Sequence, residues 1–215
     1  MKTLIQTMFV FAVGILHMPL MAEEVRQITW SDLVPTHLAD VDPLANLTPE
    51  QQDLVGWIIY MLETLPPRTA DTEDLYESLD QEMPLLKKYN IDIKKIMAQI
   101  HEVQTAVVKE LDGQHVRMPG YLLPLEITDG KVTQFLLVPY VGACIHVPPP
   151  PPNQIVHVKV AQSKGLKRGG LFDPVWVTGR IKAKSMVKDL FLIDGSANID
   201  IGYTMQADRV EPYKQ

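Results

Sequence analysis

An internal disulfide is excluded for this chain, because Cys144 is the one cysteine among its 215 residues. A single cysteine cannot form an internal disulfide, so we expect the fold to be held by packing. Positive charge is also scarce: 20 lysines and arginines against 26 aspartates and glutamates give a formal net charge of −6. Nucleic-acid binding needs a basic surface, so this composition argues against nucleic acid as a partner.

The signatures of several enzyme classes are also missing. The chain has no glycine-rich phosphate loop, no G-x-G-x-x-G turn, no G-x-S-x-G elbow and no H-E-x-x-H helix. His101 and Glu102 begin like the last of these motifs, but the second histidine is absent. The sequence therefore favours a non-enzymatic role, with a thiol-dependent enzyme that uses Cys144 as the alternative.

The first 22 residues have the features of a secretory signal peptide. An apolar run over residues 4–16 follows Lys2, and Ala22 precedes an acidic pair. The run is shorter than the about 20 apolar residues that a membrane span needs. We expect cleavage after residue 22 and a periplasmic mature chain without a transmembrane segment. The residue directly after the expected cleavage point is Glu23 rather than a cysteine, so we do not expect a lipoprotein. Loss of Lys2 leaves 19 basic residues against 26 acidic ones, a net charge of −7.

Residues 23–106 have the patterns of helices and loops. Thr48-Pro49-Glu50-Gln51 is typical of a helix start, since Thr48 can cap the helix and Gln51 can complete a capping box. Apolar residues at helical spacing over 93–103 predict a helix that packs against the sheet. Ahead of these helices, "ITWSDLVP" predicts an extended or turn segment that packs Trp30 and Leu33 onto the body.

Residues 107–215 have the pattern of β-strands. Runs rich in Val, Ile and Tyr, separated by turn signals such as Asp129-Gly130, predict five strands. They cover residues 115–126, 132–142, 154–160, 174–184 and 199–213. The predicted fold class is α+β: N-terminal helices packed on a C-terminal five-stranded antiparallel OB-like β-barrel. A β-sandwich is the alternative. We expect the portions 23–106 and 107–215 to form one compact unit.

The stretch "VPYVGACIHVPPPPPNQIVHV" carries the candidate site. Side chains two apart in a strand share a face, so Cys144 and His146 are expected to point the same way. His157 lies on the next predicted strand, and His115, at the start of the first strand, is a candidate fourth group. A thiolate with imidazoles suits zinc or copper(I), which makes these residues a candidate metal site. The alternatives are Cys144 as an inert core residue and His157 as a structural histidine.

The five consecutive prolines give that stretch a second interpretation. Pro148, Pro149, Pro150, Pro151 and Pro152 are expected to adopt polyproline II, which has no internal hydrogen bonds. Together with Asn153 and Gln154 they form a candidate partner-binding ridge. The alternative is a stiff crossover between strands. A separate basic loop, "SKGLKRGG" at residues 163–170, predicts a solvated connection, with an anion or lipid headgroup contact as its alternative.

Four segments resemble a known family. "ITWSDLVP", "GYLLPLE", "FLLVPYVGACIHVPPPPPNQIV" and "PVWVTGRI" are similar to the bacterial periplasmic family named domain of unknown function 3299. The resemblance covers nearly the whole mature chain, and the Cys-x-His-proline block is its most specific part. It implies an exported protein of a Gram-negative bacterium, encoded near envelope ABC-type transport systems, some of them linked to metal handling. It supplies no catalytic residues.

Taken together, these patterns predict an exported non-enzymatic binding or accessory protein. It would serve an envelope ABC-type transport or metal-handling system, with a transporter component or another periplasmic protein as partner. Its candidate functional surface is the block of Cys144, His146 and the prolines. A metal-free protein–protein interaction module of the cell envelope is the first alternative, and the Cys144-dependent thiol enzyme is the second.

Overall fold

The computed structural model describes residues 24–143, 149–167, 170, 172–192 and 195–213, without side-chain detail at 189–192 and 195–197. The segment expected to be a signal peptide lies outside these residues. No helix in the described ranges is long and apolar enough to cross a membrane.

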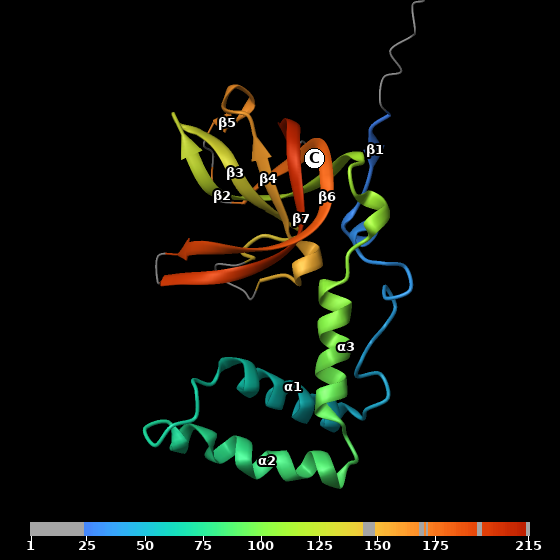
Figure 1. Ribbon diagram of the computed structural model, residues 1–215, viewed down its shortest axis with the longest axis vertical. Helices are drawn as coiled ribbons and strands as arrows, with labels where there is room; N and C mark the ends of the chain where they lie inside the picture. Colours follow the sequence, from blue (N-terminus) through green and yellow to red (C-terminus); the bar gives the residue numbers. More distant parts are fainter. Residues whose placement is uncertain (1–23, 144–148, 168–169, 171, 193–194, 214–215) are drawn as a thin grey trace, which may run out of the picture.

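Between residue 24 and the middle of the chain, the structure has three α-helices (Figure 1). They are α1 (Pro49–Thr64), α2 (Glu77–Lys88) and α3 (Ile93–Thr105). Short 3-10 helices are η1 (Trp30–Leu33), η2 (Glu73–Tyr76), η3 (Lys109–Leu111), η4 (Pro152–Gln154) and η5 (Gln162–Lys164). The predicted start of α1 is confirmed, because Thr48 Oγ1 accepts from the Gln51 amide at 3.3 Å and Gln51 Oε1 accepts from the Thr48 amide at 3.0 Å.

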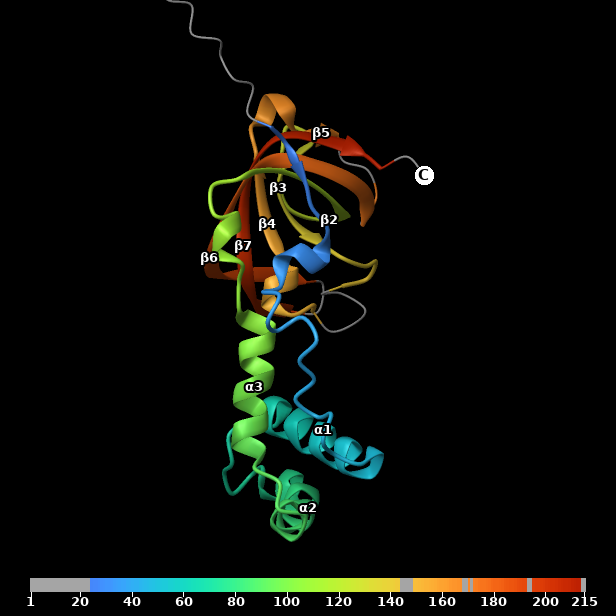
Figure 2. The same ribbon diagram turned by 90° about the vertical axis from the view of Figure 1, so that its right-hand side faces the viewer.

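The helices pack mainly against one another, at the end of α3 that is remote from the sheet (Figures 1 and 2). Their shared apolar cluster contains five buried residues: Val55, Ile58, Leu79, Leu86 and Ile96. Ile93 and Ile100 of α3 pack against the same cluster. The predicted packing of this apolar stripe on the sheet is therefore wrong. The pattern marks an apolar face, and α1 and α2 cover that face.

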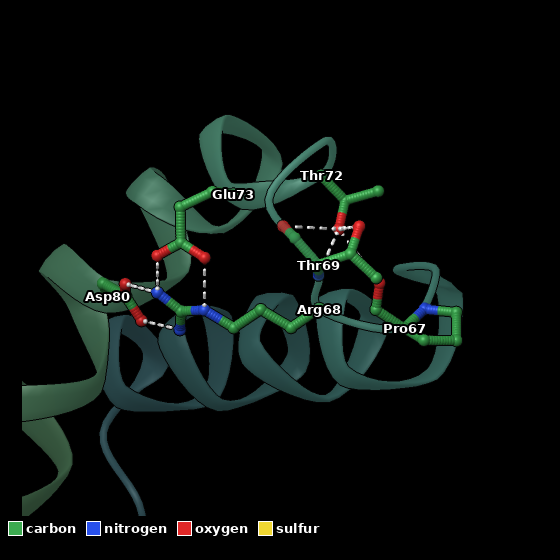
Figure 3. Close-up of polar contacts among 6 residues, drawn as sticks. All are labelled: Pro67, Arg68, Thr69, Thr72, Glu73 and Asp80. Carbon is green, nitrogen blue, oxygen red and sulfur yellow. Dashed lines mark hydrogen bonds and ion pairs between the residues drawn. The ribbon is translucent and has the colours of Figure 1, made fainter.

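The connection between α1 and α2 is tied by one arginine (Figure 3). The Arg68 guanidinium donates to both Glu73 oxygens, at 2.5 and 3.0 Å, and to both Asp80 oxygens, at 2.7 and 3.0 Å. It also lies over the Tyr76 ring, 4.9 Å from the ring centre. These hydrogen bonds lower the pKa of the Glu73 and Asp80 carboxyls and raise the pKa of Arg68. All of the ion pairs are solvent-exposed, so each adds little to stability.

The second half of the chain and the short N-terminal strand β1 form one mixed sheet. Its strands are β1 (Arg26–Gln27), β2 (His115–Thr128), β3 (Lys131–Val138), β4 (Val156–Val160), β5 (Leu166–Lys167), β6 (Asp173–Leu192) and β7 (Gly195–Pro212). Their order is β1-β2-β6-β7-β4-β3-β5, and β2 also pairs with β3. The α+β class is confirmed.

Two details of the predicted sheet are corrected. The described residues form seven strands rather than five. The two additional strands, β1 and β5, have two residues each, which is too short to show an alternation of apolar and polar residues in the sequence. The sheet is also mixed rather than antiparallel, since β1–β2 and β4–β7 are parallel pairs. The β4–β7 pair joins strands that are far apart in sequence, which local patterns cannot indicate.

The main core lies under the sheet and includes the N-terminal segment. Leu33 of η1 is fully buried in it, and Trp30 packs against it, as predicted. The Tyr203 hydroxyl donates to the Leu33 carbonyl at 2.7 Å and accepts from the Val108 amide at 2.6 Å. The Trp30 indole also explains why residue 120 is a glycine. A Cβ at this position would lie 2.8 Å from the indole and 2.7 Å from the Leu137 side chain. The segment "ITWSDLVP" is thus part of the core of the sheet.

Candidate functional site

Three of the predicted site residues lie outside the described residues: Cys144, His146 and Pro148. Their part in a metal site or a partner-binding ridge stays a prediction. The structure describes the remaining candidates, which are His157, His115, Pro149 to Pro152, Asn153 and Gln154.

His157 is buried on β4, with 1% of its surface exposed. It pairs with Leu136 of β3 on one side and with Thr204 of β7 on the other. Its Nε2 atom has no hydrogen-bond partner among the described residues. Burial, together with the charges of Lys188 and Lys159, lowers the pKa of His157 to about 4. The imidazole is therefore neutral at physiological pH.

His115 lies apart from His157. Its Nε2 atom is 2.9 Å from Asp208 Oδ2, and in the sheet it pairs with Arg180 of β6. Strands β6 and β7 lie between β2 and β4 on one side and β3 lies between them on the other, so the two histidines are on strands that are not neighbours. In the part of the chain that the structure describes, no group of three metal-binding side chains comes together. The structure does not bring His115 and His157 together, and the ligand set with Cys144 and His146 stays a prediction.

The end of the proline segment is fixed to both halves of the molecule. The Asn153 side chain is buried, and its Nδ2 atom donates to the carbonyls of Val103 at 2.7 Å and Ala106 at 3.1 Å, where α3 ends. Gln154 Nε2 donates to the Trp30 carbonyl at 3.0 Å. Gly202 of β7 lets the segment approach, because a Cβ there would lie 2.9 Å from the Pro152 carbonyl oxygen. The two side-chain amides thus form bonds within the chain, which suits the crossover interpretation.

The prolines also line a groove where α3 meets the sheet, which we call the proline groove. Its volume is about 520 Å³. Its lining residues are Glu63, His101, Gln104, Thr105, Pro149, Pro150, Pro151, Pro152, Ile155, Asn198, Ile199 and Asp200. Pro149 is exposed, whereas Pro150 is buried and anchors the segment. The groove combines proline rings with the carboxylates of Glu63 and Asp200, so its surface is apolar and negatively charged.

A second hollow, the basic pocket, lies on the sheet and was missed in the sequence. Its volume is about 410 Å³. Its lining residues are His157, Lys159, Arg180, Lys182, Lys184, Met186, Thr204, Met205 and Gln206. The available signal is the alternation of Arg180, Lys182 and Lys184 along β6, which places three cationic residues on one face. That signal becomes informative only when β4 and β7 are known to lie beside β6.

The sequence profile of the family described as "Protein of unknown function (DUF3299)" matches residues 30–212. The chain belongs to the DUF3299 family. The resemblance noted in the sequence motifs is thereby confirmed. A DUF3299 family protein of known crystal structure from Pseudomonas aeruginosa is 34% identical, and the match covers 89% of this chain and 98% of that one, with a TM-score of 0.49.

A more distant similarity covers 49% of this chain and 20% of asparaginyl-tRNA synthetase from Pyrococcus horikoshii, at 19% identity and a TM-score of 0.30. A similarity at this level does not indicate a shared function. A search of curated proteins gave no significant match. The region matched by the DUF3299 profile includes every lining residue of the proline groove and of the basic pocket.

Proposed function

We propose that this DUF3299 protein is an exported, non-enzymatic binding or accessory protein of the cell envelope. It would act in the periplasm after removal of residues 1–22, as part of an ABC-type transport or metal-handling system. The observation that carries the proposal is the proline groove, which is formed by α1, the end of α3, the prolines and β7. A groove built from segments this far apart in sequence is a feature of the whole fold.

The chemistry of the proline groove suggests its partner. Prolines lack backbone N–H groups and offer rings and carbonyl oxygens, which suit aromatic side chains and hydrogen-bond donors. Glu63 and Asp200 add negative charge to the same surface. We therefore expect a segment of an envelope protein that carries an aromatic and a basic side chain. Because the bonds of Asn153 already fix the proline segment, little conformational entropy is lost on binding.

The scaffold behind the groove is proposed to be an OB-like barrel. Five strands support this view: β2, β6, β7, β4 and β3 follow one another in the sheet, and β2 also pairs with β3. Each of these five strands thus has two neighbours among the other four, as closure requires. A closed sheet would hold the proline groove on a rigid frame.

Site-specific photo-crosslinking in the source bacterium tests this function. A photoreactive residue would replace Pro149 or Asp200 in the groove, or the exposed Asp53 of α1 as control. We expect one envelope protein to be crosslinked from both groove positions and not from Asp53. A Glu63→Lys/Asp200→Lys variant should then bind that purified partner more weakly than the wild type. Equal crosslinking from all three positions, or no adduct from the groove, would contradict the proposal.

The alternatives are separated by metal binding and thiol reactivity. If Cys144 and His146 form a metal site, the mature reduced protein will bind zinc or copper(I) one-to-one, and Cys144→Ser will lose this binding. A thiol enzyme predicts fast alkylation of Cys144 near neutral pH, because a nucleophilic cysteine needs a depressed pKa. A metal-free interaction module predicts neither result, with partner binding intact in Cys144→Ser.

A further inference from the structure

The basic pocket lies on the face of the sheet that points away from the main core. Directly paired residues on neighbouring strands share a face, so β4, β7 and β6 present two rows of side chains there. The rows are His157–Thr204–Lys182 and Lys159–Gln206–Arg180. Val158 and Ile181, which alternate with them, are buried in the core. The pocket shares no lining residue with the proline groove.

Positive charge is concentrated in this pocket although the chain is acidic overall. Four cationic side chains line it, and no aspartate or glutamate is among the lining residues. In the described ranges no carboxylate forms an ion pair with Lys159, Lys182 or Lys184. Like charges gathered on one face repel one another unless an anion lies between them. The arrangement therefore favours an anionic occupant.

His157 adds a buried polar atom to the same pocket. The side chain is 1% exposed and lines the pocket, and Nε2 has no partner among the described residues. Buried polar atoms in native proteins almost always have hydrogen-bond partners. An oxyanion that enters beside Thr204 and Lys182, and displaces the side chains that cover Nε2, would give this atom such a partner.

We propose that the basic pocket binds a phosphate monoester. Lysine donates charge-assisted hydrogen bonds to phosphate oxygens, and the Thr204 hydroxyl adds a neutral donor. The volume of about 410 Å³ exceeds that of a phosphate group alone and falls within the range of small-molecule sites. Met186 provides apolar lining for the organic part of the ligand.

A metal ion is the competing occupant. His157 and Met186 line the same pocket, and a thioether with an imidazole suits copper(I). The four surrounding cations oppose a metal cation, so electrostatics favours the phosphate monoester.

Binding of phenyl phosphate to the mature protein, measured by calorimetry at low salt, tests the proposal. We expect saturable one-to-one binding that weakens by about tenfold or more in Lys182→Gln/Lys184→Gln, which loses two charge-assisted donors. His157→Leu should weaken binding while thermal unfolding shows an intact fold, because its pair Leu136 is apolar. The matched control is Lys167→Gln, an exposed charge on β5 outside the pocket, which should bind like the wild type.

Two further measurements distinguish a lipid headgroup from a soluble phosphate monoester as the ligand. Phosphatidic acid carries a phosphate monoester headgroup, so binding to phosphatidylcholine vesicles is compared with and without it. Vesicle binding that phenyl phosphate inhibits would indicate a lipid headgroup, and phenyl phosphate binding without vesicle binding would indicate a soluble ligand. The proposal is overturned if neither probe binds, if Lys167→Gln loses as much as the pocket variants, or if copper(I) alone binds and His157→Leu abolishes that binding.

Discussion

The sheet and the helical portion are stabilised to very different degrees. The core of the sheet buries large side chains completely, among them Tyr203, Phe135 and Leu33. The helical cluster has five buried residues, and the ion pairs of Arg68 in the connection between α1 and α2 are exposed and add little to stability. Stability differs across a structure in this way when apolar burial differs. We therefore expect the helical portion to open first and the sheet to unfold with the whole chain.

The largest effect is expected for Gly179→Ala, in the middle of β6. A Cβ at this position would lie 2.7 Å from Ala207 Cα and still closer to the Gln206 carbonyl oxygen, and backbone cannot move aside cheaply. The variant should lose about 3 kcal/mol of unfolding free energy, at the upper end of overpacking costs. Urea unfolding followed by circular dichroism measures it. A loss below about 1 kcal/mol would mean that β6 and β7 can separate easily here.

Asn153→Ala should weaken the connection between the two regions. It leaves the carbonyls of Val103 and Ala106 without their side-chain donor, which costs about 2 kcal/mol. Hydrogen exchange should show faster opening of α3 than of β7. Gln154→Ala is the comparison, because its bond goes to Trp30 rather than to α3. Equal exchange of α3 in both variants would show that Asn153 does not hold the helical portion.

Acid should destabilise the sheet through His157. The native pKa of about 4 lies below the ordinary value of 6.5, so between these values the unfolded chain binds the proton and the native chain does not. Stability contributed by the neutral imidazole is complete above pH 6.5 and falls as pH drops toward 4, by about 2 kcal/mol at pH 5. Urea unfolding at pH 7 and pH 5, beside His157→Leu, measures this loss. The variant should lose less stability than the wild type over this interval, and equal losses would disprove the assignment.

Gly56→Ala makes the same substitution in the helical portion that Gly179→Ala makes in the sheet, and we expect the opposite effect on stability. No atom lies within 4 Å of a Cβ at Gly56, in the interior of α1. Alanine should therefore stabilise the helical portion by about 1 kcal/mol. Slower hydrogen exchange in α1, with β7 unchanged, would confirm that the two regions open separately. Equal slowing in both regions would show that they unfold as one unit.

The smallest effect is expected for Arg68→Ala. All its partners are exposed, and salt screens such pairs. The helical portion should open slightly more often at low ionic strength, and the difference from the wild type should disappear at high salt. Exchange rates of the α2 amides at two salt concentrations measure it. A large loss that persists at high salt would show that the Tyr76 contact, rather than charge, holds the loop.

Local chemistry made part of the fold predictable. The Thr48 capping box set the start of α1, and Asp129-Gly130 formed the turn between β2 and β3, where both residues have positive φ. Trp30 and Leu33 packed as their apolar character indicated. In each case the decisive interaction lies within a few residues or requires only burial.

Features that depend on distant strands could not be predicted. Lys159 and Lys182 lie 23 positions apart in sequence and come together only because β7 pairs with β4 on one side and β6 on the other. His115 and His157 were grouped for their chemistry, yet β6 and β7 separate them. The local pattern of residues indicates neither the proximity of the two lysines nor the separation of the two histidines.

The amide of Asn153 couples the proline groove mechanically to the helical portion. It joins the residue after Pro152 to the last turn of α3, and α3 ends among α1 and α2 at its other end (Figure 1). A ligand that shifts the prolines must either break these two bonds or move α3 with them. If α3 moves, α1 and α2 move with it. Binding of a ligand in the proline groove would then change the position of the helical portion relative to the sheet.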